Sequence, residues 1–282
     1  MIEWFTEAFE PDLMQRALLA GLLASAATAV VGTWVVLRGL TFLGDALAHG
    51  VVPGLALALL WGFSPMVGAF VAALVMSGAV TLVSRRARVR EDTGIGLLFV
   101  GMLALGVVII SRSESFTTDV TSVLFGDVLG VTSDDLSGQA IGAAVVVVAS
   151  IVLYRPFLAL AFNADKAATL GLRPTLTHVA LMVLLATSIV ASFQAIGTLL
   201  VFGLLIGPPA TASLIVRRVP LIMVTAVGLG AVAVVLGLAI SYHHDTAGGA
   251  TIAGLAVAEF FVVLAVQEAT KAVRHARHRH AV

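Results

Sequence analysis

Apolar residues occur in this chain in long runs that short polar segments separate. An α-helix rises about 1.5 Å per residue, so that about 20 apolar residues cross the roughly 30 Å hydrocarbon core of a bilayer. Nine runs approach this length, at residues 13–37, 40–61, 64–84, 93–111, 137–154, 175–193, 195–216, 220–242 and 249–267. The pattern predicts an all-α, polytopic membrane protein in which residues 1–282 form a single transmembrane domain.

The charged residues between these runs predict how the chain is oriented. If the N-terminus lies outside, nearly all Lys and Arg residues fall on the cytoplasmic side, and only Arg16 and Arg112 fall on the outer side. The cytoplasmic group would consist of Arg38, Arg85, Arg86, Arg88, Arg90, Arg155, Lys166, Arg173, Arg217, Arg218, Lys271, Arg274, Arg277 and Arg279. Because basic residues favour the cytoplasmic side, we expect an extracytoplasmic N-terminus and a cytoplasmic C-terminus.

Two segments between the runs do not fit a simple span-and-loop pattern. Residues 121–131 are apolar but too short to cross the bilayer, which predicts an outer-leaflet or re-entrant helix that is buried in protein. Residues 155–174 form a polar cytoplasmic connection. Within it, a short helix from Lys166 to Leu170 is expected, because Gly171 and Pro174 would end it.

Composition supports the membrane assignment and limits the chemistry. Hydrophobic residues make up 60% of the chain and charged residues 11%, whereas soluble domains are about 25% charged. The chain has no cysteine, so that His, Asp, Glu and backbone carbonyls are left as metal ligands. Its formal net charge of zero gives no reason to expect a nucleic-acid partner. The sequence also lacks a glycine-rich nucleotide-binding loop with its lysine, so that ATP hydrolysis would require another chain.

Three residues in the second run suggest a site. Asp45 and His49 lie inside an apolar segment, where an ionisable side chain costs about 2.5–3.5 kcal/mol even on lenient scales. In a helix these two residues are about 40° apart, on one face, and both can bind a divalent transition metal. Pro53 has no N–H for the carbonyl of His49, so that this oxygen could bind the same ion, and Pro53 is also a candidate gate residue. The alternative is a hydrogen-bonded pair that merely fixes two helices.

Glu259 is the other acidic residue predicted at mid-membrane depth. It could be a second metal ligand or part of a charge relay. The alternative is a protonated or hydrogen-bonded glutamate that packs within the bundle.

A late span contains further candidate gate residues. Pro208 and Pro209 would free the carbonyls of Leu204 and Leu205 and kink the helix, which suits a gate. Gln194, at the outer end of the same hairpin, is a candidate polar gate residue. Proline kinks are also common in spans without any such role.

Two histidine-containing segments lie outside the predicted spans. His243, His244 and Asp245 would form a cluster on the outer face, where an incoming metal could arrive, although adjacent loop histidines are more often solvated. The tail, residues 271–282, contains His275, His278 and His280 between Arg residues that repel a cation. We therefore expect it to bind anionic lipid rather than metal.

The motif around Asp45 resembles the signature of metal-importing ABC permeases, the membrane subunits of bacterial manganese, zinc and iron uptake systems. The residues that carry this resemblance are Arg38, Gly39, Gly44, Asp45, Ala46, His49, Pro53 and Gly54. Residues 197–212 resemble the late proline-containing span of the family, and residues 241–245 with Gly248 and Gly249 give a weaker match. A further segment resembles the cytoplasmic helix that docks on the ATPase, through Asp165, Lys166, Ala167, Ala168, Leu170 and Gly171.

The resemblance implies a homodimer in the bacterial plasma membrane. It also implies two cytoplasmic ATPase subunits as partners and an extracytoplasmic metal-binding protein that delivers the ion. Two copies of Asp45 and His49 would then face one central pore. The metal would be a transported substrate rather than a permanently bound cofactor, and the chain itself would not be an enzyme. A site of His and carboxylate without sulfur suits Mn²⁺, Fe²⁺ and Zn²⁺ alike.

Two other functions remain open on the sequence. One is a proton-coupled metal carrier or channel without an ATPase, in which Asp45, His49 and Glu259 relay protons. The other is a membrane scaffold that transports nothing. Dependence of flux on ATP or on a pH gradient separates the two transport functions, and the absence of flux identifies the scaffold.

Overall fold

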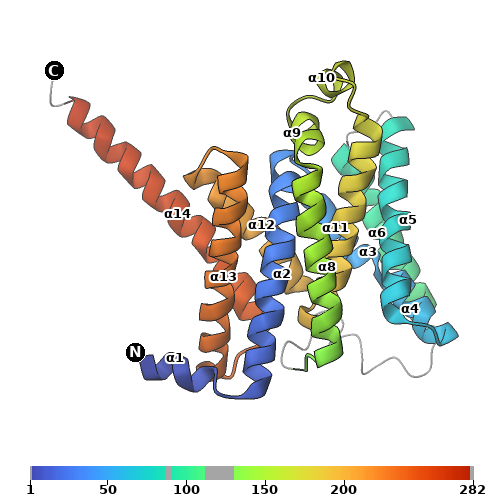
Figure 1. Cartoon of the computed structure of the whole chain (residues 1–282), viewed down its shortest axis with the longest axis horizontal. Coiled ribbons are helices and arrows are strands. Elements are labelled where there is room, and N and C mark those ends of the chain that lie inside the picture. Colours follow the sequence, from blue (N-terminus) through green and yellow to red (C-terminus); the bar gives the residue numbers. More distant parts are fainter. Residues whose placement is uncertain (1, 87–90, 112–129, 280–282) are drawn as a thin grey trace.

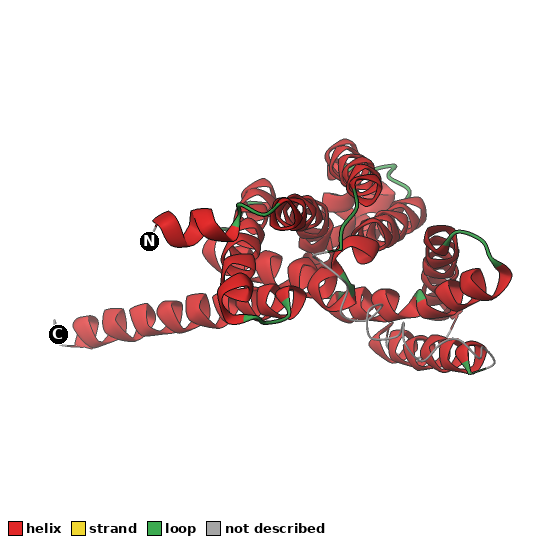
Figure 2. Ribbon diagram, turned by 90° about the horizontal axis from the view of Figure 1, so that it is seen from below, coloured by secondary structure: helices red, strands yellow, loops and turns green. Residues whose placement is uncertain are grey.

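The fold is a bundle of long helices, and the computed structural model describes residues 2–86, 91–111 and 130–279 (Figure 1). These residues contain helices and connecting loops but no strand (Figure 2). The helices are α1 (Ile2–Ala8), α2 (Asp12–Leu37), α3 (Thr41–Gly50), α4 (Val52–Trp61), α5 (Pro65–Arg86), α6 (Glu91–Ile110), α8 (Ser133–Val152), α9 (Tyr154–Phe162), α10 (Ala164–Thr169), α11 (Pro174–Ile196), α12 (Thr198–Ile215), α13 (Val219–His244) and α14 (Gly248–Arg279).

The described residues contain nine helical segments that are long and apolar enough to cross a membrane. They coincide with the nine predicted runs, with ends that differ by a few residues, and α3 and α4 together make the second span, Thr41–Trp61. The predicted all-α polytopic fold is therefore confirmed. Of the predicted outer segment 121–131, residues 121–129 lie outside the described residues.

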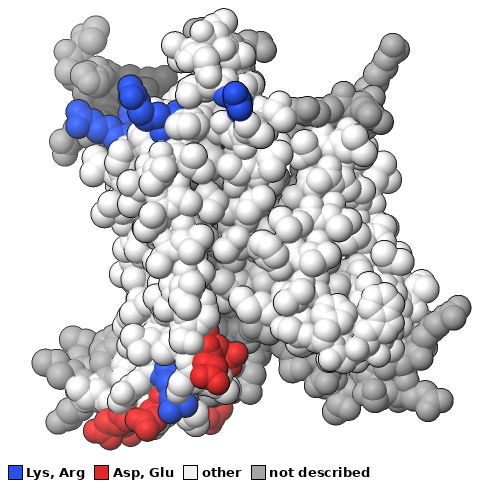
Figure 3. Space-filling view, turned by 45° about the vertical axis from the view of Figure 1, so that its right-hand side comes forward, with Lys and Arg blue, Asp and Glu red and all other residues white. Residues whose placement is uncertain are grey.

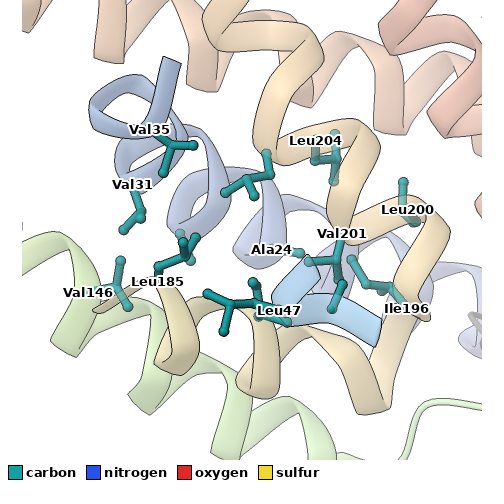
Figure 4. Close-up of a cluster of buried hydrophobic side chains, with 14 of the residues drawn as sticks. Ala24, Val31, Val35, Leu47, Val146, Leu185, Ile196, Leu200, Val201 and Leu204 are labelled. Atoms are coloured by element: carbon teal, nitrogen blue, oxygen red, sulfur yellow. The ribbon is translucent and has the colours of Figure 1, made fainter. Parts of the chain in front are cut away.

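Helix α2 lies at the centre of the bundle and contacts α8, α11, α12 and α13. One of its faces consists of small buried residues, among them Ala17, Ala20, Ala24 and Ala27. Small residues allow helix backbones to approach closely in lipid, where association depends on packing rather than on the hydrophobic effect. Figure 4 shows the resulting core, in which apolar side chains of α2, α3, α8, α11 and α12 meet.

In this core, the backbones of α2 and α12 are in direct contact. Both prolines of α12 lie inside the helix, and Pro209 has no N–H to donate to the carbonyl of Leu205. That oxygen packs against Gly32 of α2, where a Cβ atom would overlap it. A Cα–H···O contact of this kind is weakly favourable. In this structure Gly32 of α2 covers the carbonyl oxygen of Leu205, and the gate role of Pro208 and Pro209 stays a prediction.

Charged side chains gather at the two ends of the bundle (Figure 3). At one end, which we call the basic end, lie Arg155, Arg173, Arg217 and Arg218, next to the C-terminus of α2 and the start of α11. The other, acidic end carries Glu7, Glu10, Asp12, Asp134, Asp135 and Asp245, together with Arg16. The C-terminal part of α14 extends away from the bundle on the basic side, whereas α1 lies at the acidic end (Figure 1).

The contact between Gly32 and Leu205 gives a test of the packing. Gly32→Ala is expected to lower the melting temperature of the detergent-solubilised protein by several degrees, because overpacking a core costs about 1–3 kcal/mol. Tryptophan fluorescence during heating measures this. Gly228→Ala in α13 is the matched control, since a Cβ there meets no atom within 4 Å. Equal melting temperatures for the two variants would contradict the tight crossing.

Candidate metal site on helix α3

A tight turn places the start of α3 directly after the end of α2. The N–H groups of Arg38 and Leu40 donate to the carbonyls of Trp34 and Val35. Gly39 has a φ of 68°, a left-handed conformation that glycine adopts without strain. This explains why the motif has glycine at this position, and it ties the start of α3 to the last turn of α2.

Helix α3 has one buried face and one open face. Its buried side includes Leu43, Leu47 and Gly44, and a Cβ at Gly44 would overlap the side chain of Leu205 in α12. Glycine at this position therefore lets α3 lie close to α12. The opposite face carries Asp45 and His49, whose side chains are 28% and 27% exposed.

The two polar groups of this face lie next to each other, as the sequence predicted. Nε2 of His49 is 3.5 Å from Oδ1 of Asp45, longer than the roughly 2.7–3.2 Å of a well-formed hydrogen bond. Two atoms that each bind one ion at about 2.1 Å lie about 3.0–3.4 Å apart at octahedral or tetrahedral angles. The observed separation is close to that range, so that a small movement would let both atoms bind the same ion.

Phe99 of α6 packs against the pair. Its ring meets the imidazole of His49 edge-on, with centroids 5.7 Å apart, and it also contacts Phe42 at 6.4 Å. An aromatic wall restrains the orientation of the imidazole and excludes water on that side. Phe99 could not be identified from the sequence, because nothing distinguishes it from the other apolar residues of its span.

The helix is interrupted directly after His49, as Pro53 predicted. Helix α3 ends at Gly50 and α4 begins at Val52, and the carbonyl of His49 accepts the N–H of Val51 rather than that of residue 53. Gly54 follows the break and touches Gly68 of α5, backbone to backbone. Pro53 therefore interrupts the helix, and Gly54 allows α4 to pack closely against α5.

One chain provides only part of a metal site. Over the described ranges, no three His, Asp or Glu side chains come close enough to hold an ion. A transition metal in a protein takes about four or more ligands. Asp45 and His49 would therefore need ligands from backbone, water or a second chain.

Glu259 does not complete this pair. It lies one helical turn beyond Ala256, whose backbone is close to Gly207 of α12, and its Oε2 atom is buried without a hydrogen-bond partner in the described residues. No group of three potential ligands in the described residues of this single chain includes Glu259, so that its role as a further ligand or as part of a charge relay stays a prediction.

The outer histidine cluster has a structural role. The ring of His243 stacks on Trp4 at 4.4 Å, and its Nε2 atom donates to the carbonyl of Trp4 at 2.9 Å, which ties α1 to α13. Asp245 ends α13 with a φ of 50°. His244 and Asp245 are exposed, but they do not form a three-ligand group with His243. The role of these three residues in receiving metal at the outer face stays a prediction.

The predicted cytoplasmic helix is present at the basic end as α10. The N–H groups of Gly171 and Leu172 donate to the carbonyls of Ala168 and Ala167, and Gly171 has a φ of 74°. Ala168 and Leu170 are exposed, as an outward surface requires, whereas Ala167 is 1% exposed. Ala167, which the resemblance assigns to the docking helix, therefore packs against its own chain rather than outward.

A groove of about 620 Å³ lies beside α10. It is lined mainly by apolar side chains of α9, α10 and the following loop, among them Leu158, Phe162, Ala167, Leu170 and Leu172, with Arg155 also lining it. Phe162 and Leu170 are 77% and 73% exposed. Exposed apolar side chains that line a groove at the basic end are a candidate contact surface for another molecule.

For several other candidate residues the structure does not describe the side chain. These are Gln194, Asp165, Lys166 and the histidines of the tail. His178, which was not among the predicted site residues, lies near the start of α11 and contacts Arg38. Its ionisable side chain inside the run 175–193 was the signal that could have identified it.

The chain is similar in sequence and in fold to known membrane transport proteins. Residues 10–267 match the model of the ABC 3 transport family. The probable iron transport system membrane protein of Haemophilus influenzae is 34% identical over 94% of this chain and 97% of its own length. The manganese import system permease protein ScaB of Streptococcus parasanguinis is 34% identical over 99% of this chain and all of its own length. The solved structure of PsaBC from Streptococcus pneumoniae in complex with Fab matches with a TM-score of 0.83 and 31% identity, over 93% of this chain and 95% of that one.

The fold and the polar pair on α3 thus define a multi-pass helical membrane permease. The chain belongs to the ABC 3 transport family. The resemblance to metal-importing ABC permeases that the sequence motifs indicated is confirmed.

Proposed function

We propose that this chain is the permease subunit of an ATP-driven importer that moves a divalent transition-metal ion into the cytoplasm across the bacterial plasma membrane. The observation that carries the proposal is the partly exposed pair of Asp45 and His49, 3.5 Å apart on a helix that belongs to a candidate membrane span. A carboxylate and an imidazole without sulfur suit Mn²⁺, Fe²⁺ or Zn²⁺. The named relatives are manganese and iron transport proteins, which supports the same class of substrate.

The site is proposed to be completed by a second copy of the chain. Each copy contributes one carboxylate and one imidazole on the open face of α3, and two copies that face each other would surround one ion with four such groups. This number is what a transition metal requires. Because a transport site must also release its ion, partial exposure of the ligands suits it better than full burial.

The basic end is proposed to face the cytoplasm, because Lys and Arg residues are enriched on the cytoplasmic side of membrane proteins. The acidic end, with Asp134, Asp135 and Asp245, would then face outward. A surface of negative charge raises the local concentration of cations. It is the side on which an extracytoplasmic metal-binding protein would deliver the ion.

The ATPase is proposed to cover α10 and the adjacent groove. Ala168 and Leu170 point outward there, and Phe162 forms part of the groove. These apolar side chains lie at the basic end, where a cytoplasmic partner would bury them. Ala167 would support this surface from beneath rather than contact the partner.

Substitution of Asp45 and His49 tests whether these residues bind the transported ion. In proteoliposomes that contain the permease and its ATPase, Asp45→Asn and His49→Ala are expected to lower metal uptake at least about tenfold, because even outer-shell changes cost 10–100-fold in affinity. Dimer assembly and basal ATP hydrolysis should persist. Uptake of radioactive manganese measures the effect. Asp134→Asn, an exposed carboxylate at the acidic end, is the control.

Two results would contradict this assignment. Normal uptake by Asp45→Asn at wild-type expression would remove its role as a ligand. Wild-type uptake that needs a pH gradient but no ATP would identify a proton-coupled carrier instead.

Substitution of Leu170 tests the proposed ATPase surface. Leu170→Glu places a charge in the apolar contact and is expected to weaken co-purification of the ATPase about tenfold or more, with insertion and dimerisation intact. Leu13→Glu, an exposed apolar position at the acidic end, is the matched control. If Leu170→Glu retains both ATPase binding and uptake, α10 is not the docking helix.

A further inference from the structure

A hydrogen bond joins the turn between α2 and α3 to the second turn of α11. Nη1 of Arg38 lies 2.9 Å from Nδ1 of His178. A guanidinium can only donate, so that Nδ1 of His178 is the acceptor and carries no proton. Hydrogen bonds with a charged donor are roughly twice as strong as neutral ones, which makes this a firm link between two distant parts of the sequence.

On one side, the link leads directly to the candidate metal site. Arg38 is the residue at which α2 ends, and α3 begins at Thr41. The intervening turn is fixed by the left-handed Gly39 and by the bond from Leu40 to Val35. Asp45 follows within about two helical turns. A displacement of the Arg38 side chain therefore acts on the start of the helix that carries both ligands.

On the other side, the link leads to the proposed ATPase surface. His178 lies in the second turn of α11, and a four-residue loop, 170–173, separates α11 from α10. That loop is also fixed, by the left-handed Gly171 and its bonds to the end of α10. Helix α10 lies beyond the start of α11 at the basic end (Figure 1). Movement of α10 would therefore carry the first turns of α11 with it.

We infer that Arg38 and His178 form a coupling link, through which movement of α10 by the ATPase shifts α3 and its two ligands. The inference rests on the proposed function and specifies how its two ends communicate. Both residues act by positioning and neither contacts the ion.

The test uses the complete importer in proteoliposomes and measures metal ions moved per ATP hydrolysed. His178→Leu removes the acceptor, and Arg38→Met removes the donor. Each is expected to lower the ratio at least about fivefold, while ATP hydrolysis, co-purification of the ATPase and manganese affinity stay near wild type. His178→Asn, whose amide oxygen can accept from Arg38, is expected to restore most of the ratio.

The double variant Arg38→Met with His178→Leu completes the test. If the bond is the link, the double variant is no worse than either single one, because both remove the same interaction. An unchanged ratio in the single variants, additive losses in the double variant, or parallel loss of ATPase co-purification would overturn the inference. Failure of the wild-type protein to bind its ATPase or move metal would instead overturn the proposed function.

Discussion

The close packing of α12 against α2 and α3 decides which residues of this protein can act. Gly32 and Gly44 have no side chain, and α12 lies on both of them through Leu205. With one side of α3 held in this way, Asp45 and His49 have to lie on its open side. A methyl group at either glycine would push α12 away and change the direction of the polar face. The position of the candidate site therefore follows from packing at two glycines.

The same arrangement explains how an acid can persist in an apolar span. An ionised carboxylate is costly at membrane depth unless it has polar partners. In one copy, Asp45 has a histidine beside it at a distance slightly too long for a good hydrogen bond, and Phe99 restrains that histidine. The pair is thus close but incompletely satisfied. Such a pair gains most when a cation arrives, and the proposed second copy would add an equal set of ligands.

Features that depend on one helix alone could be predicted from the sequence. Nine spans, the break after His49 and the shared face of Asp45 and His49 follow from length, hydropathy, proline chemistry and helical spacing. Features that depend on contacts between helices could not be predicted. The carbonyl of Leu205 is covered by α2, Ala167 is turned inward, and His243 is held by Trp4. The bond from Arg38 to His178 joins residues 140 positions apart, which no local pattern encodes.

The most direct test of the central claim is pulsed electron paramagnetic resonance of Mn²⁺ bound to the purified importer. We expect one Mn²⁺ per two permease chains, with modulation from directly bound histidine nitrogen in the wild type. His49→Ala should abolish that nitrogen signal, whereas His244→Ala, at an exposed histidine outside the site, should leave it unchanged. A nitrogen signal that persists in His49→Ala, or one ion bound to each chain separately, would contradict a shared site made by α3.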